Sequence, residues 1–328
     1  MKALIVREQP EGTFTKRIEE KELSLLPDHD VLIEVHYAAL NYKDALSASG
    51  HKGITKKYPH TPGVDAAGVI AEDKSGKFKV GEKVICTSYD LGMNTDGAFA
   101  EYIRVPADWI VRLPQSMSLE ESMIMGTAAY TAALALHKME RCGQNPGMGE
   151  IVVTGASGGV GSMAIAVLAR AGYQVIASSD KTDQYEYLMS LGAHRCITRS
   201  HVNDTSGKPV LRSKWAGAID NVGGNTLHTL IKACAKEGCI ASIGLVESPD
   251  FNLTVYPFIL NGVNLLGVDS AETKMETRQH IWNKLSDEWK PAQLGLAKKI
   301  VTLDEIPAYM DLMLKGKTSG RIVAKISN

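Results

Sequence analysis

Hydrophobic and polar residues in the N-terminal third of the chain follow the short alternating pattern of β-strands. The β-rich segments cover residues 3–6, 31–37, 68–71 and 83–87, and Pro-Asp, Ser-Gly and Pro-Gly pairs lie between them. Such pairs favour tight turns, which let successive strands pair side by side. The pattern therefore predicts a compact, mostly antiparallel β domain over residues 1–120.

The pattern changes near residue 120, where helical periods begin to alternate with short apolar runs. The predicted strands are residues 151–154, 174–178, 218–222, 239–245 and 265–268, and the predicted helices are 162–171, 184–191 and 226–235. Strand–helix alternation is typical of βαβ units around a parallel sheet. We therefore predict a second domain over residues 121–270. We expect residues 271–328 to return to the first domain and to end in a strand over 321–326.

The most informative segment is an apolar strand that runs into a glycine-rich turn and then into a helix, over residues 151–162. Gly155, Gly158 and Gly161 follow a G-x-x-G-x-x-G spacing, which departs from the usual G-x-G-x-x-G of dinucleotide sites. Such a turn brings the backbone close to a pyrophosphate, and the helix N-terminus offers free N–H groups and partial positive charge. The context favours dinucleotide binding over a purely structural turn. The candidate phosphate ligands are Ser157, Gly158, Gly159, Val160 and Gly161.

The end of the next predicted strand bears on which dinucleotide binds. NAD sites usually place an acidic residue there for the ribose 2′-hydroxyl. This chain has Ser178, Ser179, Asp180 and Lys181. Two hydroxyls and a cation suit a 2′-phosphate, so Ser178, Ser179 and Lys181 favour NADPH. If the strand ran further than predicted, Asp180 would become the NAD-type acid, and this alternative stays open.

Composition excludes several functional classes. The chain has 328 residues, 44% hydrophobic and 22% charged, with a formal net charge of -1, which gives no reason to expect nucleic acid or a membrane as a partner. Its N-terminal apolar run is too short for a signal peptide. Residues 123–136 are apolar-rich but shorter than a membrane span, and they predict a buried core helix. The five cysteines are odd in number, scattered and lack a C-x-x-C pair, which argues against a disulfide framework and a cysteine-rich zinc site and favours a reducing, cytoplasmic location.

Segments from nearly the whole chain resemble one family. They are residues 40–45 (LNYKDA), 62–68 (PGVDAAG), 126–132 (GTAAYTA), 152–161, 215–220 (WAGAID), 256–260 (YPFIL) and the pair Gly320-Arg321. In this order they resemble the zinc-free medium-chain dehydrogenase/reductases, in the branch of acryloyl-CoA reductases and YhdH/YhfP-type quinone oxidoreductases. The resemblance implies an α/β fold with a GroES-like β-rich catalytic domain and a Rossmann-type, doubly wound parallel-sheet cofactor domain.

The resemblance also bears on metal binding. Zinc-dependent relatives hold their catalytic metal with Cys, His and Cys, and these positions fall on Asn41, Val64 and Thr127. Valine cannot ligate a metal, and asparagine and threonine are not usual zinc ligands. The chain also lacks the four-cysteine cluster of the family's structural zinc lobe. We therefore expect no metal, and zinc-type alcohol oxidation becomes an unfavoured function.

Without a metal, the resemblance implies NADPH-dependent reduction of a conjugated C=C in a small electron-poor substrate. Hydride addition builds charge on the substrate's oxygen and leaves an α-carbon that needs a proton. Tyr42 is the candidate donor, because a phenol is protonated at neutral pH; the alternative is that Tyr42 only contacts the nicotinamide. An acryloyl-CoA-type thioester is the leading substrate, with Lys52, Lys56 and Lys57 as candidates for its phosphates. A quinone or enone reductase, and a non-catalytic NADPH-binding redox sensor, are the alternatives.

The remaining expectations also come from the resemblance. Thr131 is expected to touch the nicotinamide, or else to bond to its own helix. Asp44 and Asp65 are expected to form buried ion pairs. The rest of the cofactor site is assigned to Asn221, Val222, Leu245, Val246, Asn261 and Arg321, of which Arg321 has a surface position as its alternative. A homodimer through sheet edges around residues 265–270 is expected.

Overall fold

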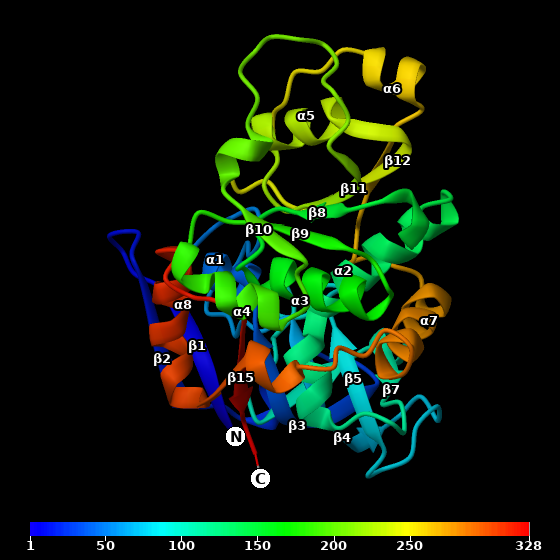
Figure 1. Cartoon of the computed structure of the whole chain (residues 1–328). Helices are drawn as coiled ribbons and strands as arrows, with labels where there is room; N and C mark the ends of the chain where they lie inside the picture. Colours follow the sequence, from blue (N-terminus) through cyan, green and yellow to red (C-terminus); the bar gives the residue numbers. More distant parts are fainter. Residues whose placement is uncertain (328) are drawn as a thin grey trace. The chain divides into compact units, whose positions relative to one another are not determined.

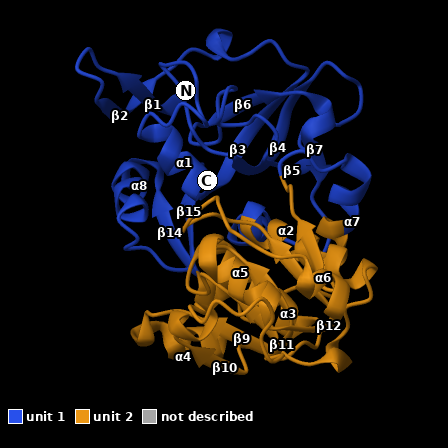
Figure 2. Cartoon of the chain, turned by 90° about the horizontal axis from the view of Figure 1, so that it is seen from above, with its two compact units in different colours: residues 1–127, 271–280, 298–328 blue, residues 128–270, 281–297 orange. Residues whose placement is uncertain are grey.

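The computed structural model describes residues 1–327, which fall into two compact units. The first holds residues 1–127, 271–280 and 298–327, and the second holds 128–270 and 281–297 (Figure 2). The chain passes from one unit to the other after residues 127, 270, 280 and 297, and the passages after 127 and 280 lie inside two helices, α2 (Leu119–Arg141) and α7 (Met275–Ser286). The units therefore differ from the domains predicted above by grouping residues 121–127 with the first unit and residues 281–297 with the second.

Strands from both ends of the chain form one mixed sheet in the first unit (Figure 1). Its order is β14 (Lys298–Thr302), β15 (Arg321–Lys325), β3 (Val31–Leu40), β4 (Asp65–Asp73), β5 (Lys83–Thr87) and β7 (Ile110–Arg112), and β6 (Tyr102–Val105) also pairs with β3. Only β14 and β15 pair in parallel among these described strands. A separate hairpin pairs β1 (Lys2–Glu8) with β2 (Phe14–Glu20). The predicted mostly antiparallel β fold of this part is confirmed.

Two helices cover the core of this sheet. They are α1 (Tyr42–Ala48) and α8 (Ile306–Leu314), and they pack against each other. Alternate residues of β3, such as Val31 and Ile33, are fully buried in the same apolar cluster as Ala45 of α1 and Met310 of α8. Burying one face of an amphipathic helix on a β-sheet is the main stabilising contribution in such a layer.

The second unit contains a sheet whose pairs are all parallel. Its order is β10 (Arg195–Ile197), β9 (Val175–Ser178), β8 (Ile151–Val153), β11 (Trp215–Asp220), β12 (Cys234–Ser242) and β13 (Asn264–Gly267). In chain order this is 3-2-1-4-5-6, the order of dinucleotide-binding Rossmann sheets. The direction of winding reverses between β8 and β11, and ligands of such sheets bind outside the carboxyl ends of the strands at this point.

Helices lie on both faces of the parallel sheet (Figure 1). They are α3 (Gly159–Arg170) and α4 (Tyr185–Ser190) on one face, and α5 (Gly224–Lys232) and α6 (Tyr256–Asn261) on the other. β8, β9 and β11 are buried along their whole length, which is why their sequences read as continuous apolar runs. The predicted doubly wound fold is confirmed.

The sequence patterns locate most elements, and the misses have physical reasons. The predicted strand over 83–87 matches β5 at both ends, whereas β2, β10 and β14 were not predicted because they carry charged residues on exposed edges. The predicted helix over 226–235 ends early at Lys232, since β12 already begins at Cys234. The predicted core helix lies within α2, which is broken at Gly126 by non-helical angles (φ 48°, ψ -156°).

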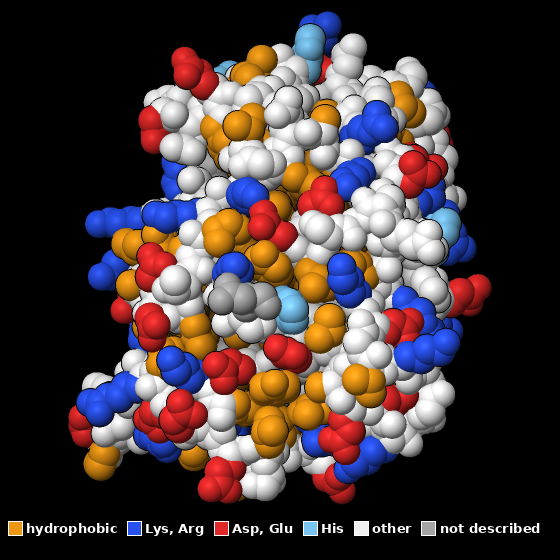
Figure 3. Space-filling model, turned by 90° about the horizontal axis from the view of Figure 1, so that it is seen from below, with side chains coloured by type: hydrophobic (Ala, Val, Ile, Leu, Met, Phe, Trp, Pro, Cys, Tyr) orange, Lys and Arg blue, Asp and Glu red, His pale blue; other side chains and the backbone are white. Residues whose placement is uncertain are grey.

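Charge is mixed over the part of the surface seen in Figure 3. Lysine and arginine side chains lie among aspartate and glutamate on that face, with apolar patches between them. Among residues 1–327, no helix is long and apolar enough to cross a membrane.

Candidate functional site

The glycine loop (residues 154–161) connects β8 to α3 in the second unit. Gly155 has a left-handed backbone (φ 58°), and its carbonyl oxygen accepts the N–H of Gly158 at 3.0 Å. A Cβ on Gly161 would lie only 2.2 Å from that same oxygen, so α3 can approach the turn this closely only with glycine there. The first N–H groups of α3 have no acceptor within the helix, which makes this end suited to phosphate oxygens.

Asn221 and Val222 lie beside the glycine loop, at the point where the winding reverses. Thr154 Oγ1 donates to Asp220 Oδ1 at 2.6 Å, and Asn221 donates its Nδ2 hydrogen to the Thr154 carbonyl at 2.8 Å. Asp220 is fully buried and also accepts the N–H of Gly223 at 2.8 Å. Burial raises the pKa of Asp220, and these hydrogen bonds oppose the rise. The network fixes the ends of β8 and β11 against each other.

Three serines gather at the carboxyl end of β9. Ser178 is its last residue, and Ser157 of the glycine loop lies 3.5 Å from Ser179, measured between their Oγ atoms. Ser179 Oγ also accepts the N–H of Lys181 at 3.1 Å. Ser178 is 1% exposed, and its hydroxyl has no hydrogen-bond partner among the described residues. The structure thus brings Ser157, Ser178, Ser179 and the backbone of Lys181 together beside the glycine loop.

Arg199 joins this edge, and sequence reasoning missed it. β10 pairs with β9 so that Ile197 lies opposite Ser178, which places Arg199 beside Asp180 just past both strand ends. Asp180 Oδ1 accepts the Arg199 N–H at 2.8 Å, and the Arg199 guanidinium lies 3.9 Å from Asp180 Oδ2. Because β9 ends at Ser178, Asp180 is not the last residue of the strand. Recognising β10 as the parallel partner of β9 would have pointed to Arg199. The strand has only three residues, which is too few to show a strand pattern in the sequence.

The loop after β12 reaches the same edge. Ile243 donates its N–H to the Asp220 carbonyl at 2.9 Å, and Glu247 donates to the Val222 carbonyl at 2.8 Å. Leu245 and Val246, between these two anchors, are 64% and 78% exposed. The structure therefore brings Leu245 and Val246 to the winding reversal, with their side chains uncovered within this unit.

Thr131 and Asn261 lie elsewhere in the second unit. Thr131 Oγ1 donates to Ser270 Oγ at 2.8 Å, in the segment after β13. Asn261 ends α6 and lies 3.5 Å from the carbonyl of Cys234, the first residue of β12. A crossover helix returns to the amino ends of the strands, so Asn261 is at the opposite edge from the glycine loop. Its expected contact with the cofactor stays a prediction.

Tyr42 opens α1 in the first unit. Its side chain is 55% exposed, and the helix start is fixed by Asp44, whose Oδ2 accepts the Asn41 N–H at 2.7 Å. Asp44 is fully buried, and its Oδ1 accepts the N–H of Val64 at 2.9 Å. Burial raises the pKa of Asp44 to about 7, although the backbone N–H groups favour the charged form. Asp44 therefore has amide donors around it instead of the ion pair expected from the sequence.

Asp65 is the centre of a carboxylate cluster, defined as Asn41, Asp44, Asp65, Thr127 and Arg321. Its Oδ2 accepts hydrogens from Asn41 Nδ2 and from the Thr127 N–H, each at 2.8 Å. Arg321 lies 3.6 Å from the same oxygen and donates to Asn41 Oδ1 at 3.1 Å. Asp65 therefore forms the expected buried ion pair.

Arg321 does not have the surface position that was considered as its alternative. It is 3% exposed, and its Nε donates to the Ile124 carbonyl at 3.0 Å. A buried guanidinium held this way balances the charge of Asp65. The expected contact of Arg321 with a phosphate stays a prediction. The break at Gly126 makes room for the pair, because a Cβ there would lie 2.5 Å from Asp65 Oδ2 and 2.7 Å from Arg321.

The three positions that correspond to zinc ligands meet in this cluster. Asn41 and Thr127 both donate to Asp65, and Val64 donates its N–H to Asp44. The side-chain amide of Asn41 and the hydroxyl of Thr127 thus both donate hydrogen bonds to the Asp65 carboxylate. Over residues 1–327, no group of three or more His, Cys, Asp or Glu side chains is placed to hold a metal ion.

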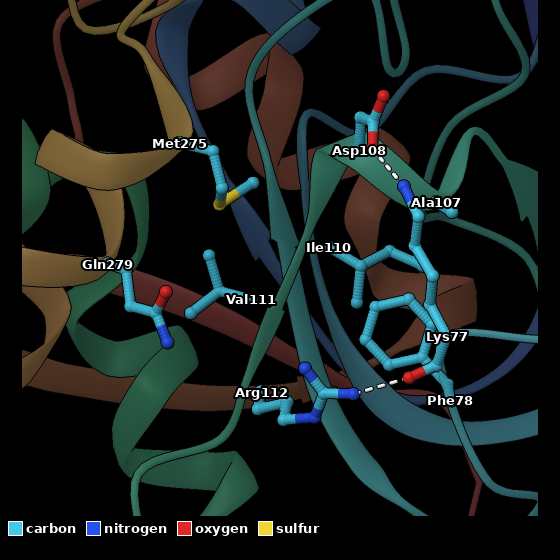
Figure 4. Close-up of a pocket in the computed structure, with 9 residues that line it drawn as sticks. All are labelled: Lys77, Phe78, Ala107, Asp108, Ile110, Val111, Arg112, Met275 and Gln279. Atoms are coloured by element: carbon cyan, nitrogen blue, oxygen red, sulfur yellow. Dashed lines mark hydrogen bonds and ion pairs between the residues drawn. The ribbon is translucent and has the colours of Figure 1, made fainter.

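A hollow of about 310 Å³ also lies in the first unit, and none of the predicted site residues lines it (Figure 4). Its charged groups already pair with one another or with close neighbours. Lys77 Nζ lies 2.5 Å from Asp108, and Arg112 donates to Glu82 and to the Lys77 carbonyl. The hollow therefore offers no uncompensated charge to a ligand.

Known proteins similar to this chain decide the family. Residues 27–115 match the family described as Alcohol dehydrogenase GroES-like domain, and residues 159–287 match Zinc-binding dehydrogenase. YhfP of Bacillus subtilis strain 168, named as a quinone oxidoreductase, is 41% identical over 302 residues, which is 92% of each chain. The chain belongs to the medium-chain dehydrogenase/reductase family. AcuI of Escherichia coli strain K12, named as an acrylyl-CoA reductase, is 39% identical over 327 residues and the full length of both chains. The resemblance to this branch is confirmed.

Two solved structures of this dehydrogenase/reductase branch cover nearly all of the chain. The YhdH oxidoreductase of Salmonella enterica, solved in complex with NADP, has a TM-score of 0.96 at 39% identity and covers 100% of both chains. YhfP of Bacillus subtilis, solved with NAD bound, has a TM-score of 0.96 at 39% identity and covers 99% of this chain and 98% of its own. These two members of the family therefore carry different dinucleotides.

Proposed function

We propose that this chain is an NADPH-dependent oxidoreductase that reduces the conjugated C=C of a small electron-poor substrate without a catalytic metal. The observation that carries the proposal is the serine-lined end of β9 beside the glycine loop, in a chain 39% identical to a protein solved with NADP. The leading substrate is an acryloyl-CoA-type enoyl thioester.

The residues of the second unit fit NADPH. The glycine loop and the start of α3 suit its pyrophosphate. The buried hydroxyl of Ser178 has no hydrogen-bond partner within residues 1–327, and a phosphate oxygen would satisfy it. Lys181 and Arg199 would add positive charge around a 2′-phosphate. Asp180 already accepts a hydrogen bond from Arg199, which supports NADPH over NAD.

The first unit would supply the proton that the reduced substrate needs. Bound NADPH would provide the hydride. Tyr42 presents an exposed phenol on a helix start that Asp44 holds in place, and its Oη would donate toward the substrate. Metal-free chemistry is supported by the cluster around Asp65, where Asn41 and Thr127 direct their donors to the carboxylate.

The enoyl thioester is supported by AcuI, named as an acrylyl-CoA reductase and 39% identical to this chain. Coenzyme A carries phosphates, which need cations. Lys52 already has partners within the chain, because its Nζ lies 2.9 Å from Glu8 and 4.9 Å from the centre of the Tyr58 ring. Lys56 and Lys57 are exposed and are the better candidates.

The test is NADPH oxidation by the purified protein with acryloyl-CoA, crotonyl-CoA and a quinone in parallel, each with and without a chelator. We expect turnover that is fastest with acryloyl-CoA, slower with NADH and unaffected by the chelator. Binding of NADPH without turnover of any substrate would support the redox-sensor alternative. Loss of activity with the chelator, restored by zinc, would refute the metal-free reaction.

The Tyr42→Phe variant tests the proton donor, because it keeps the ring and removes only the hydroxyl. General acid catalysis contributes about 10²–10⁴-fold, so turnover should fall by that factor while NADPH affinity stays near wild type. An unchanged single-turnover rate and solvent isotope effect would leave Tyr42 as a binding residue only. Tyr42→Ala is the comparison that removes the ring as well.

A quinone oxidoreductase is the second candidate, because YhfP carries that name at 41% identity. Faster turnover of the quinone in the parallel assay would favour it.

We also propose a homodimer through β13, the edge strand of the parallel sheet, beside the exposed Ile259 and Leu260 of α6. Light scattering on the purified protein would report the mass of a single chain if this interface did not form.

A further inference from the structure

Two of the five cysteines lie against the same backbone atom in the second unit. The carbonyl oxygen of Met139, in the last turns of α2, accepts the N–H of Cys142 at 3.0 Å. The thiol of Cys239, on β12, lies 3.8 Å from the same oxygen. Residues far apart in the sequence therefore meet where α2 ends on the sheet, and neither thiol is used in the function proposed above.

The backbones on both sides of this contact are held in register. Gln144 is 2% exposed, and its Oε1 accepts the N–H of Cys239 at 3.0 Å. The Gln144 N–H donates in turn to the Met139 carbonyl at 3.1 Å. One buried glutamine therefore fixes the turn that carries Cys142 to the strand that carries Cys239. A disulfide needs such a fixed, short approach, because Cβ atoms about 3.5–4.5 Å apart and a narrow torsion range are required.

The two thiols differ in access. Cys142 is exposed, whereas Cys239 is fully buried. Burial, with a smaller contribution from the neighbouring Cys142 thiol, raises the pKa of Cys239 to about 11. An oxidant from solution therefore meets Cys142 first, and Cys239 reacts only with a sulfur that is already beside it.

We propose that Cys142 and Cys239 form a reversible disulfide by exchange with a small disulfide such as oxidised glutathione. The Cys142 thiolate attacks one glutathione sulfur, which forms a mixed disulfide and releases one glutathione thiolate. Cys239 then loses its proton to water and attacks the Cys142 sulfur, which releases the second glutathione thiolate. Two electrons pass from the protein to the reagent, which leaves as two molecules of reduced glutathione. The product links the end of α2 to β12.

The experiment treats the full-length, NADPH-free protein with oxidised glutathione and maps its peptides by mass spectrometry without reduction. The expected product is a linked pair of peptides containing Cys142 and Cys239, with a loss of two hydrogen atoms, that disappears on addition of dithiothreitol. The Cys239→Ala variant should stop at the mixed disulfide on Cys142. The Cys142→Ser variant, which changes an exposed residue, should form neither product.

Cys234 provides the matched control. It is fully buried and also lies on β12, with its thiol 3.8 Å from the Ala216 carbonyl. Cys234→Ala should leave the cross-link intact, which separates loss of a partner from loss of packing. The proposal is overturned if the wild type retains only glutathione on Cys142, or if the linked peptides contain Cys234 in place of either residue.

Discussion

The glycine loop of the second unit, proposed to bind phosphate, and the carboxylate cluster of the first unit are built from different groups. In the glycine loop, side chains are absent where they would interfere, and Gly161 lies where a Cβ would be 2.2 Å from a carbonyl. In the carboxylate cluster, buried side chains carry the charge, with Asp65 held by Asn41, Thr127 and Arg321.

The difference has a physical basis. Backbone N–H groups at a helix start are available wherever the chain folds correctly, so a local motif can build a phosphate site. A buried carboxylate needs donors and a counter-charge, and these come from whichever segments the fold places around it. Substitutions should therefore act on ligand binding in the glycine loop and on stability in the carboxylate cluster.

The Arg321→Met variant should produce the largest effect on folding. It leaves Asp65 buried without its cation, and removing one partner of a buried pair typically costs about 3–5 kcal/mol. The free energy of unfolding, measured in urea, should fall by that amount. In the double variant Asp65→Asn/Arg321→Met the loss should be smaller than the sum of the single losses, because no buried charge remains. If Arg321→Met unfolded at the same urea concentration as wild type, the hydrogen bonds from Asn41 and Thr127 would be enough to stabilise the buried Asp65 carboxylate.

Asp44 should make stability fall as pH rises. Its folded pKa of about 7 lies above the ordinary value of 3.8, so the folded state binds the proton more tightly between these values. The free energy of unfolding should therefore decrease from pH 4 to pH 7, by at most about 4 kcal/mol. The Asp44→Asn variant removes the titration and should flatten that slope, although it also loses an acceptor. An identical pH slope in both proteins would contradict the shift.

The Lys181→Ala variant should affect the cofactor and leave folding nearly unchanged. A charge-assisted hydrogen bond to phosphate is worth about 1.5–3 kcal/mol, so the dissociation constant for NADPH should rise at least about tenfold while that for NADH stays constant. Arg199→Ala is the companion variant at the same edge, predicted from the structure alone. Equal weakening of NADPH and NADH would place these residues away from the 2′-phosphate.

The Gly161→Ala variant tests whether the loop geometry is as tight as its contacts indicate. The added methyl would force the Gly155 carbonyl to move, at a cost of about 1–3 kcal/mol, and NADPH binding should weaken. Gly158→Ala is the matched control, because its Cβ would lie 3.3 Å from the same oxygen and its φ of -77° suits any residue. The expected order of cofactor affinity is wild type, then Gly158→Ala, then Gly161→Ala, and a reversed order would contradict the packing argument.

The sequence was informative where the signal is local. One stretch of chain contains the apolar runs of β8 and β9, the glycine spacing and the serines after Ala177. From this stretch alone, the sequence predicts which edge of the sheet binds the cofactor. The assignment of Asn261 to the cofactor came from the resemblance, and it stays a prediction, because Asn261 lies against the first residue of β12. Sequence reasoning missed Arg199 because β10 is too short to show a strand period.

By itself, the sequence determined the parallel βαβ organisation of the second unit and the position of the glycine loop, because hydrophobic period and turn chemistry act between neighbouring residues. The family and the doubly wound order of the sheet came from the resemblance of segments along the chain to known proteins. Only the tertiary structure decided that Arg321 is buried against Asp65, that Asp44 lacks a cation, and that Cys142 meets Cys239. These contacts join segments that are far apart in the chain. Their energies depend on burial and on distances between side chains, and no pattern along one stretch of sequence specifies those quantities.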